Sequence, residues 1–418
     1  MIIDKEMKKI FFLLFSLFAL SPLLHARELK VTVSNPTDLQ RQELVEVNLT
    51  EIVRMLGADE GKAVYVKNAF GQRILSQISY DKKLLFEATV QPHGKGVFTI
   101  AIGEPLLEPV YVKGFIAKTR KDDLAWENDR TAYRVYGPPL RATGEKAYGV
   151  DVWTKSTPRL VMAERFKVDY EGNIVKDSLS RAGDKEGWNR VNMATSFHLN
   201  HGDGMDGYGV GPSLGCGAPA LYHNGELLMP WCYESVKILD NGPLRFTAEF
   251  VFGSAPIPET WNLKTETLRQ HRIISLDKGS NFNRCEVWYE GLDDQMQLAV
   301  GVVLHKEDVS QQDLRNERVL YADPTDTPAK HNSQIFVGCL FPDEMLQTKS
   351  LVLPKPQGSI AGHAIGIRDY QPSQHFTYYF GSAWSSADVH SFREWQVRAD
   401  EYLKALKAPV KVVLTPID

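Results

Sequence analysis

After its first 26 residues the sequence lacks long hydrophobic runs, and it also lacks runs of one charge and internal repeats. Without a second apolar stretch of about 20 residues, the mature chain is not expected to span a membrane stably. The formal net charge is −4 at pH 7, and lysine and arginine do not cluster, which argues against nucleic acid as a partner. These absences predict a globular protein.

Closely spaced cysteines are also missing. The four cysteines, Cys216, Cys232, Cys285 and Cys339, lie far apart in hydrophobic or glycine-rich segments, without the CxxC spacing of metal sites. We interpret them as buried thiols. The alternative is that two of them form one disulfide bridge, if the protein folds in an oxidising compartment.

The N-terminus has the layout of a cleavable export signal. Lysines occur within Met1–Lys9, residues 10–24 form a nearly unbroken apolar run, and a small residue, Ala26, precedes Arg27. A membrane anchor is the alternative, but this run is shorter than the ~20 residues that a spanning helix needs. Residues 1–26 are therefore predicted to be a signal peptide, and the mature protein is expected in the periplasm or outside the cell.

The rest of the chain has the pattern of a mostly β protein. Short alternating apolar segments are separated by glycine, proline and asparagine, which predicts strands joined by turns. Residues 27–105 are expected to form a small β-sandwich, and residues 106–418 a larger region of two stacked β layers. A helix is predicted over 392–406, followed by a last strand over 410–414.

The most unusual segment is Phe197–Ala220, which contains seven glycines. Glycine is favoured where φ is positive or where another group approaches the backbone closely, so this density predicts an ordered, specially shaped loop. Such loops often carry functional sites. The alternative is a connection with solvated polar side chains.

Histidines and acids gather in this segment. His198 and His201 are three residues apart and precede Asp203 and Asp206, a set that fits either a divalent metal site or acid–base catalysis. Both rings meet one ion only if the backbone turns after Leu199. Taken alone, each of these residues is more often a hydrogen-bonded structural group. The predicted catalytic residues are His201, Tyr208, Asp206 and His198.

Cations and aromatic residues alternate on the strands that follow. Strand alternation places Arg269 with His271, and Arg284 with Glu286 and Trp288, on common faces. Arginine binds carboxylates and aromatic rings stack on sugars, so a concave sheet of this kind suits an acidic oligosaccharide. Cross-strand ion pairing is the alternative. The predicted substrate-binding residues are Arg134, Lys155, Trp231, Arg269, His271 and Arg284.

Several strings resemble a bacterial family known as domain of unknown function 4861. They are ENDRTAYRVYG (127–137), DVWTK (151–155), HxxHGDGMDGYGVGPSLGCG (198–217) and YYFGSAWS (378–385), with weaker matches in NGPLR and LDKGSNF. The resemblance implies a galactose-mutarotase-like β-supersandwich and a role in polysaccharide degradation. One family member is an ulvan-oligosaccharide dehydratase, which implies a carbohydrate-active enzyme here.

Our leading hypothesis is β-elimination on an oligosaccharide that contains uronic acid. A base removes the C5 proton, the C4 substituent leaves, and cations neutralise the carboxylate. Loss of water would define a dehydratase, and loss of a sugar a lyase. Under this hypothesis Arg269 or Arg134 holds the carboxylate, His201 is the base and Tyr208 the acid, while His198, Asp203 and Asp206 orient the histidine or hold a metal.

Two other functions stay open. A glycoside hydrolase or mutarotase-type enzyme would use carboxylates such as Asp206 and Glu286, whose separation the sequence does not give. A non-catalytic carbohydrate-binding protein would depend on its aromatic residues, and His201→Ala would then change nothing. No cofactor is certain, and a divalent metal is one option.

Overall fold

The computed structural model describes residues 28–417, apart from 60, 254–256, 262, 264–266, 325–326 and 328–329. The predicted signal peptide, residues 1–26, lies outside the described residues. Among the described helices, none has both the length and the apolar character that a bilayer crossing requires.

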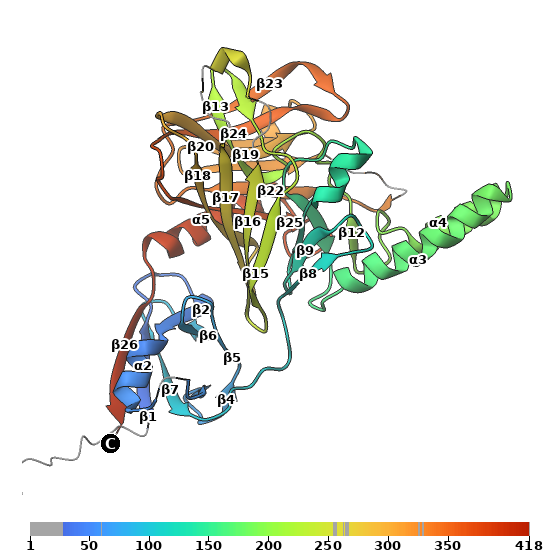
Figure 1. Ribbon diagram of the computed structural model, residues 1–418. Helices are drawn as coiled ribbons and strands as arrows, with labels where there is room; N and C mark the ends of the chain where they lie inside the picture. Colours follow the sequence, from blue (N-terminus) through green and yellow to red (C-terminus); the bar gives the residue numbers. More distant parts are fainter. Residues whose placement is uncertain are drawn as a thin grey trace, which may run out of the picture.

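The N-terminal strands form two small sheets around one core, which confirms a small β-sandwich at this end of the chain (Figure 1). The sheet orders are β26-β1-β7-β3-β4 and β2-β6-β5. The elements of this unit are β1 (Glu28–Ser34), β2 (Arg41–Asn48), α2 (Leu49–Leu56), β3 (Val64–Lys67), β4 (Arg73–Ile74), β5 (Ser76–Ile78), β6 (Lys83–Val90), β7 (Lys95–Ile102) and, from the other end of the chain, β26 (Lys411–Ile417).

The last strand lies where the sequence did not place it. It was expected to belong to the larger region, but β26 pairs antiparallel with β1, from Glu28 opposite Ile417 to Ser34 opposite Lys411. Val412 and Leu414 pack against the core of the N-terminal unit. Pairing partners are set by tertiary structure, and the alternating pattern of a strand does not identify them.

The body of the molecule consists of two large antiparallel sheets, in agreement with the mostly β fold expected (Figure 1). Buried residues of both sheets form one continuous core between them. The five-stranded sheet runs β14-β13-β19-β24-β23 and the eight-stranded sheet β15-β16-β17-β18-β25-β22-β21-β20. Their strands are β13 (Cys216–His223), β14 (Glu226–Leu228), β15 (Ser235–Asn241), β16 (Arg245–Gly253), β17 (Arg269–Asp277), β18 (Phe282–Glu290), β19 (Met296–Leu304), β20 (Gln312–Arg315), β21 (Arg318–Asp323), β22 (Ile335–Leu340), β23 (Gln347–Gln357), β24 (Ile360–Tyr370) and β25 (Phe376–Trp384).

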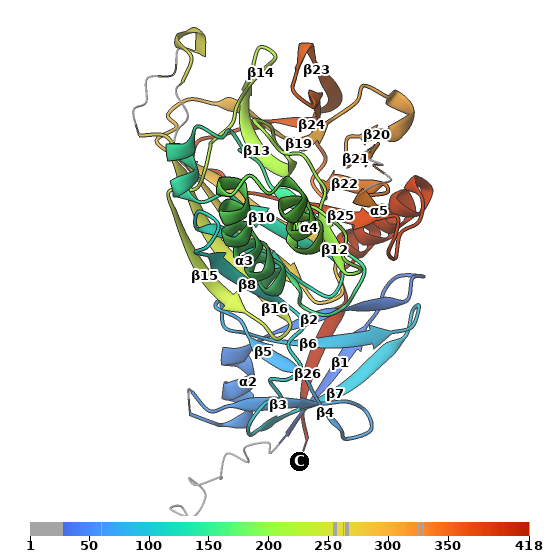
Figure 2. The same cartoon turned by 90° about the vertical axis from the view of Figure 1, so that its right-hand side faces the viewer.

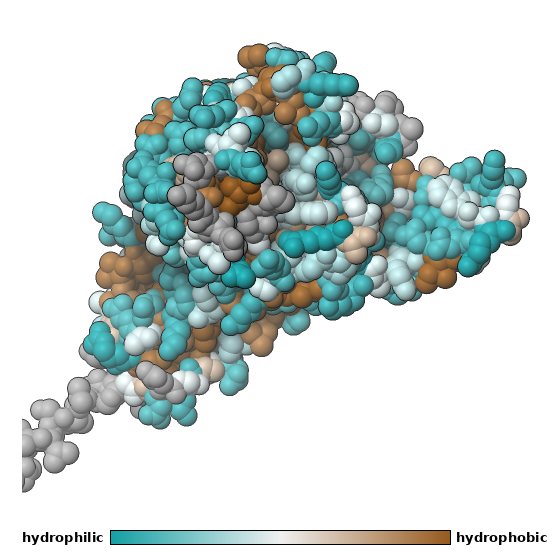
Figure 3. All heavy atoms as spheres, turned by 45° about the horizontal axis from the view of Figure 1, so that its top comes forward, coloured by the Kyte–Doolittle hydropathy of each residue, from teal (hydrophilic) through white to brown (hydrophobic). Residues whose placement is uncertain are grey.

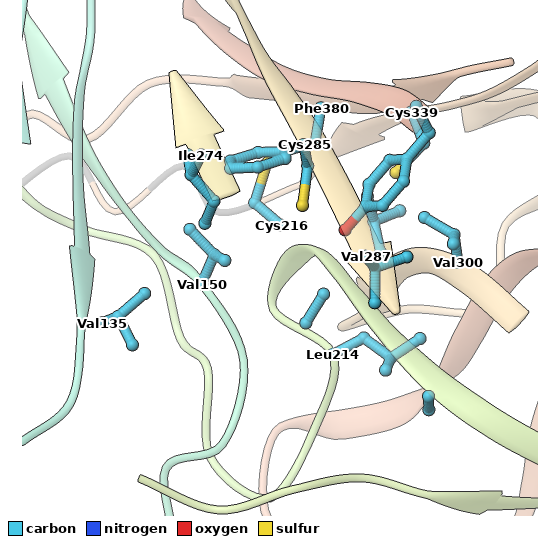
Figure 4. Packing of buried hydrophobic residues seen from close by; sticks show 14 of the residues in the cluster. Val135, Val150, Leu214, Cys216, Ile274, Cys285, Val287, Val300, Cys339 and Phe380 are labelled. Atoms are coloured by element: carbon cyan, nitrogen blue, oxygen red, sulfur yellow. The ribbon is translucent and has the colours of Figure 1, made fainter. Parts of the chain in front are cut away.

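All four cysteines are buried free thiols. Figure 4 shows Cys216, Cys285 and Cys339 between the two large sheets, beside Val287 and Phe380. Burial raises the pKa of the Cys285 thiol to about 11, so it stays protonated. The disulfide that the sequence left open is not formed, and these cysteines act as small core residues.

A third sheet, in the order β12-β11-β10-β9-β8, flanks the body and carries a helical arm that the sequence did not predict (Figure 2). Its strands are β8 (Lys113–Ala117), β9 (Asp123–Glu127), β10 (Ala132–Val135), β11 (Asp151–Lys155) and β12 (Gly204–Asp206). The arm is α3 (Met162–Arg181) and α4 (Lys185–Thr195), and the remaining helices are η1 (Pro138–Thr143), η2 (Glu259–Trp261), η3 (Val309–Gln311) and α5 (Phe392–Lys407).

The arm escaped prediction because only its base is packed. Met162 and Phe166 are buried there against Trp153 and Phe197, whereas the rest of α3 and α4 is mostly exposed. Without a long apolar stripe, its sequence does not show the amphipathic period of a core helix. Figure 3 shows the arm standing clear of the body, with a largely hydrophilic surface. The late helix α5 is confirmed, with Trp395 fully buried.

Candidate functional site

Four neighbouring strands of the third sheet bring one arginine and three aspartates together. Arg134 on β10 lies directly opposite Asp151 on β11. Its Nε donates to Asp151 Oδ2 at 2.8 Å, and its Nη2 donates to Asp206 Oδ2 on β12 at 2.9 Å. Asp123 on β9 lies 3.8 Å from Nη1, which makes no hydrogen bond within the described residues. All four side chains are buried, so this is a compact charged cluster inside the protein.

Burial shifts the protonation of this cluster. Burial and the neighbouring Asp206 raise the pKa of Asp151 to about 7, although Arg134 opposes the shift. Burial likewise raises the pKa of Asp206. Burial lowers the pKa of the Arg134 guanidinium, but the surrounding aspartates outweigh this effect and raise it overall. Near neutral pH the cluster therefore keeps a cation and can hold an extra proton on its carboxylates.

A cavity of about 480 Å³ opens beside this cluster. This volume falls within the range of roughly 300–1,000 Å³ that is typical of small-molecule sites. The glycine-rich segment forms one wall, and the loop after η1 forms another. The lining residues are Arg120, Arg134, Tyr136, Glu145, Lys146, Ala147, His198, Asp206, Gly207, Tyr208, Gly209, Val210, Gly211, Lys330 and Asn332.

His198 is the histidine of the glycine-rich segment that faces the cavity. Its Nδ1 lies 3.2 Å from the backbone oxygen of Asp206 and 3.4 Å from Asp206 Oδ2, and since both are acceptors this nitrogen carries the proton. Nε2 has no hydrogen-bond partner in the described part of the chain. The His198 side chain is 54% exposed, and burial of the rest of the ring lowers its pKa, so the ring is neutral near pH 7 and Nε2 can accept a proton.

Tyr136 presents a free phenol to the same cavity. Its ring lies 5.1 Å from the Arg134 guanidinium, and its hydroxyl forms no hydrogen bond with any described residue. Burial raises the pKa of Tyr136 well above its usual value, and the charge of Asp151 adds to the effect. The hydroxyl is therefore a proton donor over the whole physiological pH range.

Tyr208 and His201 do not have the positions that their predicted roles require. The Tyr208 ring lines the cavity, but its hydroxyl donates to the Gly215 carbonyl at 3.2 Å and is buried. His201 lies outside the cavity, where its Nε2 faces the Ser196 carbonyl at 2.9 Å. The chain does turn between the two histidines, but the turn directs only His198 into the cavity. The predictions that His201 is the base and Tyr208 the acid are therefore corrected, because neither offers a free group to the cavity.

The outer part of the cavity is cationic. Lys146 and Lys330 are exposed side chains without an ion pair among the described residues, and Arg120 lies 3.8 Å from Glu145. We call Arg120, Lys146 and Lys330 the cationic rim. Because Arg134 is surrounded by aspartates, the rim provides most of the positive charge available to a ligand.

Two predicted binding residues have structural roles instead. The Lys155 ammonium is buried, 2.6 Å from Glu127, and it also donates to two backbone carbonyls. Trp231 is half-buried and its ring packs against Tyr148 at 5.8 Å. Neither residue lines the cavity. The prediction that these two residues bind substrate is therefore corrected. The Lys155 ammonium is bonded within the protein, and the Trp231 ring packs against Tyr148 outside the cavity.

The predicted row of cations and aromatic residues exists, but it lies on the large sheet away from the cavity. Arg284 pairs with Glu286 at 2.9 Å, and Arg269 lies 3.4 Å from Glu234. His271 and His375 stack on Trp288 from the neighbouring strand and from the chain just before β25, at 4.9 and 4.5 Å. Since β18 lies between β17 and β25, the two imidazoles cover both faces of the indole, and no sugar can stack there.

Two further sequence hypotheses are affected by these positions. Asp206 lines the cavity, whereas Glu286 on β18 pairs with Arg284 and His375 outside it, so the carboxylate pair proposed for hydrolysis is not brought together.

For a metal, the described residues contain no group of three or more histidine, cysteine, aspartate or glutamate side chains arranged as ligands. Asp203, also considered as a ligand, lies 3.6 Å from Arg165 beneath the arm.

The sequence missed Tyr136 and the cationic rim. Tyr136 falls inside the string ENDRTAYRVYG, so that motif contained a signal for it. Arg120, Lys146 and Lys330 come from three separate loops, and no local pattern relates them to one another. Long-range folding alone places them around the same cavity.

The comparisons with known proteins give the following matches. The family model "Domain of unknown function (DUF4861)" matches residues 33–412. An uncharacterized protein P7 of Formosa agariphila is 26% identical over 293 residues, covering 66% of each chain. A glycosyl hydrolase family 38 protein from Enterococcus faecalis has a TM-score of 0.48 at 9% identity, covering 93% of this chain and 47% of that one. An alpha-mannosidase from the same species has a TM-score of 0.46 at 9% identity, with 93% and 46% covered. The present chain thus spans about two thirds of the Formosa relative and about half of each Enterococcus chain.

Proposed function

This chain belongs to the family described as domain of unknown function 4861, and from that premise we propose that it is an enzyme of carbohydrate breakdown that acts on acidic oligosaccharides by β-elimination. The substrate class follows from the cationic rim and from the family's resemblance to polysaccharide-degrading proteins. We further propose that the protein is exported, in keeping with the signal-like N-terminus and such a substrate.

One observation carries the proposal. A proton acceptor, His198 Nε2, and a proton donor, the Tyr136 hydroxyl, line the same cavity, and neither has a partner among the described residues. Both are neutral near pH 7, because burial lowers the pKa of His198 and raises that of Tyr136. Elimination from a uronate needs such a pair together with cations for the carboxylate.

The proposed step balances without a cofactor. His198 Nε2 takes the C5 proton, whose acidity increases when cations neutralise the adjacent carboxylate. The C5–H electron pair forms the C4–C5 double bond, and the C4–O bond breaks. Tyr136 protonates the departing oxygen, so water or an alcohol leaves and a 4,5-unsaturated uronate remains. Both groups then regain their starting protonation through solvent.

The Arg134 cluster supports this pair. Asp206 holds His198 through Nδ1, and Arg134 holds Asp206 and lies against Tyr136. Arg134 Nη1 is buried 3.8 Å from Asp123 and has no hydrogen bond among the described residues, so Arg134 contributes positive charge beside the inner cavity. In this proposal the cationic rim and Arg134 neutralise the substrate carboxylate, a role predicted from the sequence for Arg269 or Arg134.

The test uses the purified mature protein and oligosaccharides ending in glucuronic acid. Ultraviolet absorbance detects an unsaturated uronate, and mass spectrometry separates loss of water from chain cleavage. Tyr136→Phe should reduce kcat by roughly 10²–10⁴-fold, whereas Tyr170→Phe, on the exposed arm, should not change it. Absence of the unsaturated product with every uronide tried would disprove the elimination reaction.

A further inference from the structure

We infer that His305 and Asp323 are positioning residues: the doubly protonated imidazole of His305 holds the cavity wall formed by residues 207–211 in its working conformation. The expected effect on kcat rests on the proposed function. The protonation of His305 and its bond to the cavity wall do not depend on it. Neither residue lines the cavity or touches the groups that would react. They act from behind the wall.

The geometry of His305 is specific. Its Nδ1 lies 2.5 Å from Asp323 Oδ2 and its Nε2 lies 2.6 Å from the Gly209 carbonyl oxygen. The ring meets Tyr208 edge-to-face at 5.5 Å. His305 follows β19 and Asp323 ends β21, so two strands from the facing large sheets anchor the loop. This imidazole therefore connects the body to the cavity wall.

The two partners determine the protonation of the ring. A backbone carbonyl only accepts hydrogen bonds, so Nε2 must carry a proton to bind Gly209. Burial raises the pKa of Asp323, while the hydrogen bond and charge of His305 oppose that shift. In its ionised form the Asp323 carboxylate accepts from Nδ1, and that nitrogen then carries the second proton. Burial lowers the pKa of His305, but the bond to Asp323 and its charge outweigh burial and raise the pKa overall. The ring is thus held as a cation by acceptors on both sides.

This bond anchors a wall whose own backbone is glycine-rich, together with the Tyr148 N–H, which donates to the Gly211 carbonyl at 3.0 Å. Gly207, Gly209 and Gly211 alternate with two cavity-lining side chains, and Gly211 has a φ of 51°. A Cβ on Gly209 would lie 3.2 Å from His305 Nε2, so a side chain there would crowd the imidazole. A flexible loop that must present a defined surface needs an external anchor.

Other charges do not compete for the imidazole in the part of the chain that the structure describes. Asp323 is its single carboxylate partner and is itself buried, with His305 as its only ion pair there. The nearby titratable groups are the phenols of Tyr208 and Tyr321, whose pKa values burial raises, so both are neutral. The backbone N–H of Lys306, the next residue, donates a hydrogen bond to the Tyr321 hydroxyl oxygen at 3.2 Å.

This arrangement has a pH dependence with a defined sign. The folded-state pKa of His305 is raised, so the bonds it makes are fully present at low pH and are lost as pH rises through that pKa. The proton that leaves first is the one on Nε2, since Asp323 retains the other. The Gly209 bond then breaks, and the cavity wall loosens at alkaline pH.

The first experiment requires no activity. In protein labelled with ¹⁵N-histidine, long-range NMR spectra report the protonation of each ring nitrogen, and His305→Gln identifies the His305 signals. We expect both nitrogens protonated at pH 7, and in Asp323→Asn a loss of the Nδ1 proton while Nε2 stays protonated, because the asparagine amide can donate to Nδ1 and the Gly209 carbonyl only accepts. A bare ring nitrogen in the wild-type protein at pH 7 would overturn the inference.

The second experiment measures kcat against pH with the uronide substrate. Asp323→Asn should move the alkaline limb to higher pH by about one unit, roughly a tenfold higher kcat on that limb, because the neutral ring then keeps its proton on Nε2 and its bond to Gly209. His305→Gln, whose amide donates to Gly209 at every pH, should move the limb to higher pH. His390→Gln, on the exposed segment before α5, is the matched control and should leave the profile unchanged.

These readouts separate the two claims. If the protein shows no elimination with any substrate but the NMR signals behave as expected, the proposed function fails and the positioning pair stands. If elimination occurs and Asp323→Asn leaves the profile unchanged, the positioning pair is rejected while the function stands.

Discussion

At the scale of single residues, hydrogen-bond partners separate groups that look alike in the sequence. His198 and His201 lie in the same motif, yet one has a free Nε2 in a cavity and the other binds the Ser196 carbonyl. Tyr136 and Tyr208 differ in the same way, since the Tyr208 hydroxyl donates to the Gly215 carbonyl and the Tyr136 hydroxyl has no partner among the described residues. A catalytic proton transfer needs an atom that is free to make it, so these partners decide the assignment.

His198→Ala should lower kcat by roughly 10²–10⁴-fold, because the substitution removes the proton acceptor from the cavity. His201→Ala is the matched control and should leave kcat within about threefold, well inside the effect expected for a catalytic base. Both variants are measured by absorbance of the unsaturated uronate. Equal losses in the two variants would show that the base is wrongly assigned.

Asp151→Asn should change how stability depends on pH. The folded-state pKa of Asp151 is raised from 3.8 to about 7, so its contribution is fully present below pH 4 and is lost as pH rises through 7. Wild-type protein should therefore gain stability on going from pH 8 to 5, by roughly 1–4 kcal/mol at about 1.4 kcal/mol per pKa unit. The asparagine variant should lose most of this gain. Denaturant unfolding at both pH values measures the difference, and equal gains in the two proteins would contradict it.

At the scale of elements, the first and last described strands of the chain pair with each other. β26 forms the edge of the N-terminal sheet beside β1, and its side chains alternate between the core of this unit and solvent. Val412 packs against that core, whereas the neighbouring Val413 is 56% exposed. The small unit is therefore complete only when the end of the chain has been added to it.

Val412→Asp should lower the free energy of unfolding by roughly 1–3 kcal/mol, since it places a charge against an apolar core. Val413→Asp on the same strand points to solvent and should change stability by less than about 0.5 kcal/mol. Thermal unfolding followed by circular dichroism compares the two. Similar unfolding temperatures would mean that β26 does not contribute to the core of the unit.

At the scale of the whole molecule, the cavity is assembled from distant parts of the chain. The third sheet supplies the Arg134 cluster, the segment after α4 supplies His198, and separate loops supply Arg120, Lys146 and Lys330. The net charge of the chain is negative, yet the cavity mouth is cationic. This local field favours an anionic ligand over a neutral one of the same size.

Raising the ionic strength from about 0.02 M to 0.5 M should lower kcat/KM for an acidic oligosaccharide by roughly tenfold, because salt screens the exposed rim. Lys330→Gln should lower kcat/KM at low salt and weaken this salt dependence. Lys411→Gln, an exposed lysine on β26, should do neither. A salt effect unchanged in Lys330→Gln would exclude Lys330 from ligand steering.

Much of the architecture could be predicted from local pattern. Alternating segments such as Leu29–Val33 gave the strands, and the late helix followed from its own periodicity, since burial of one face leaves a visible repeat. The α3–α4 arm was missed because its exposed surface has no such repeat. Of the predicted site residues, Arg134 and the glycine-rich segment line the candidate cavity, whereas Arg269, His271 and Arg284 lie outside it.

The sequence by itself determined the mostly β fold, the family, the buried thiols and the unusual glycine-rich segment that lines the cavity. These properties depend on residue type and short spacing, which the chain displays directly. Only the tertiary structure decided that β26 pairs with β1 and that Arg134 lies among three aspartates. It also decided that two imidazoles cover both faces of the Trp288 indole, and that His198 lines the cavity while His201 does not. Each of these depends on which distant strands and loops come together and on what fills the space around a side chain.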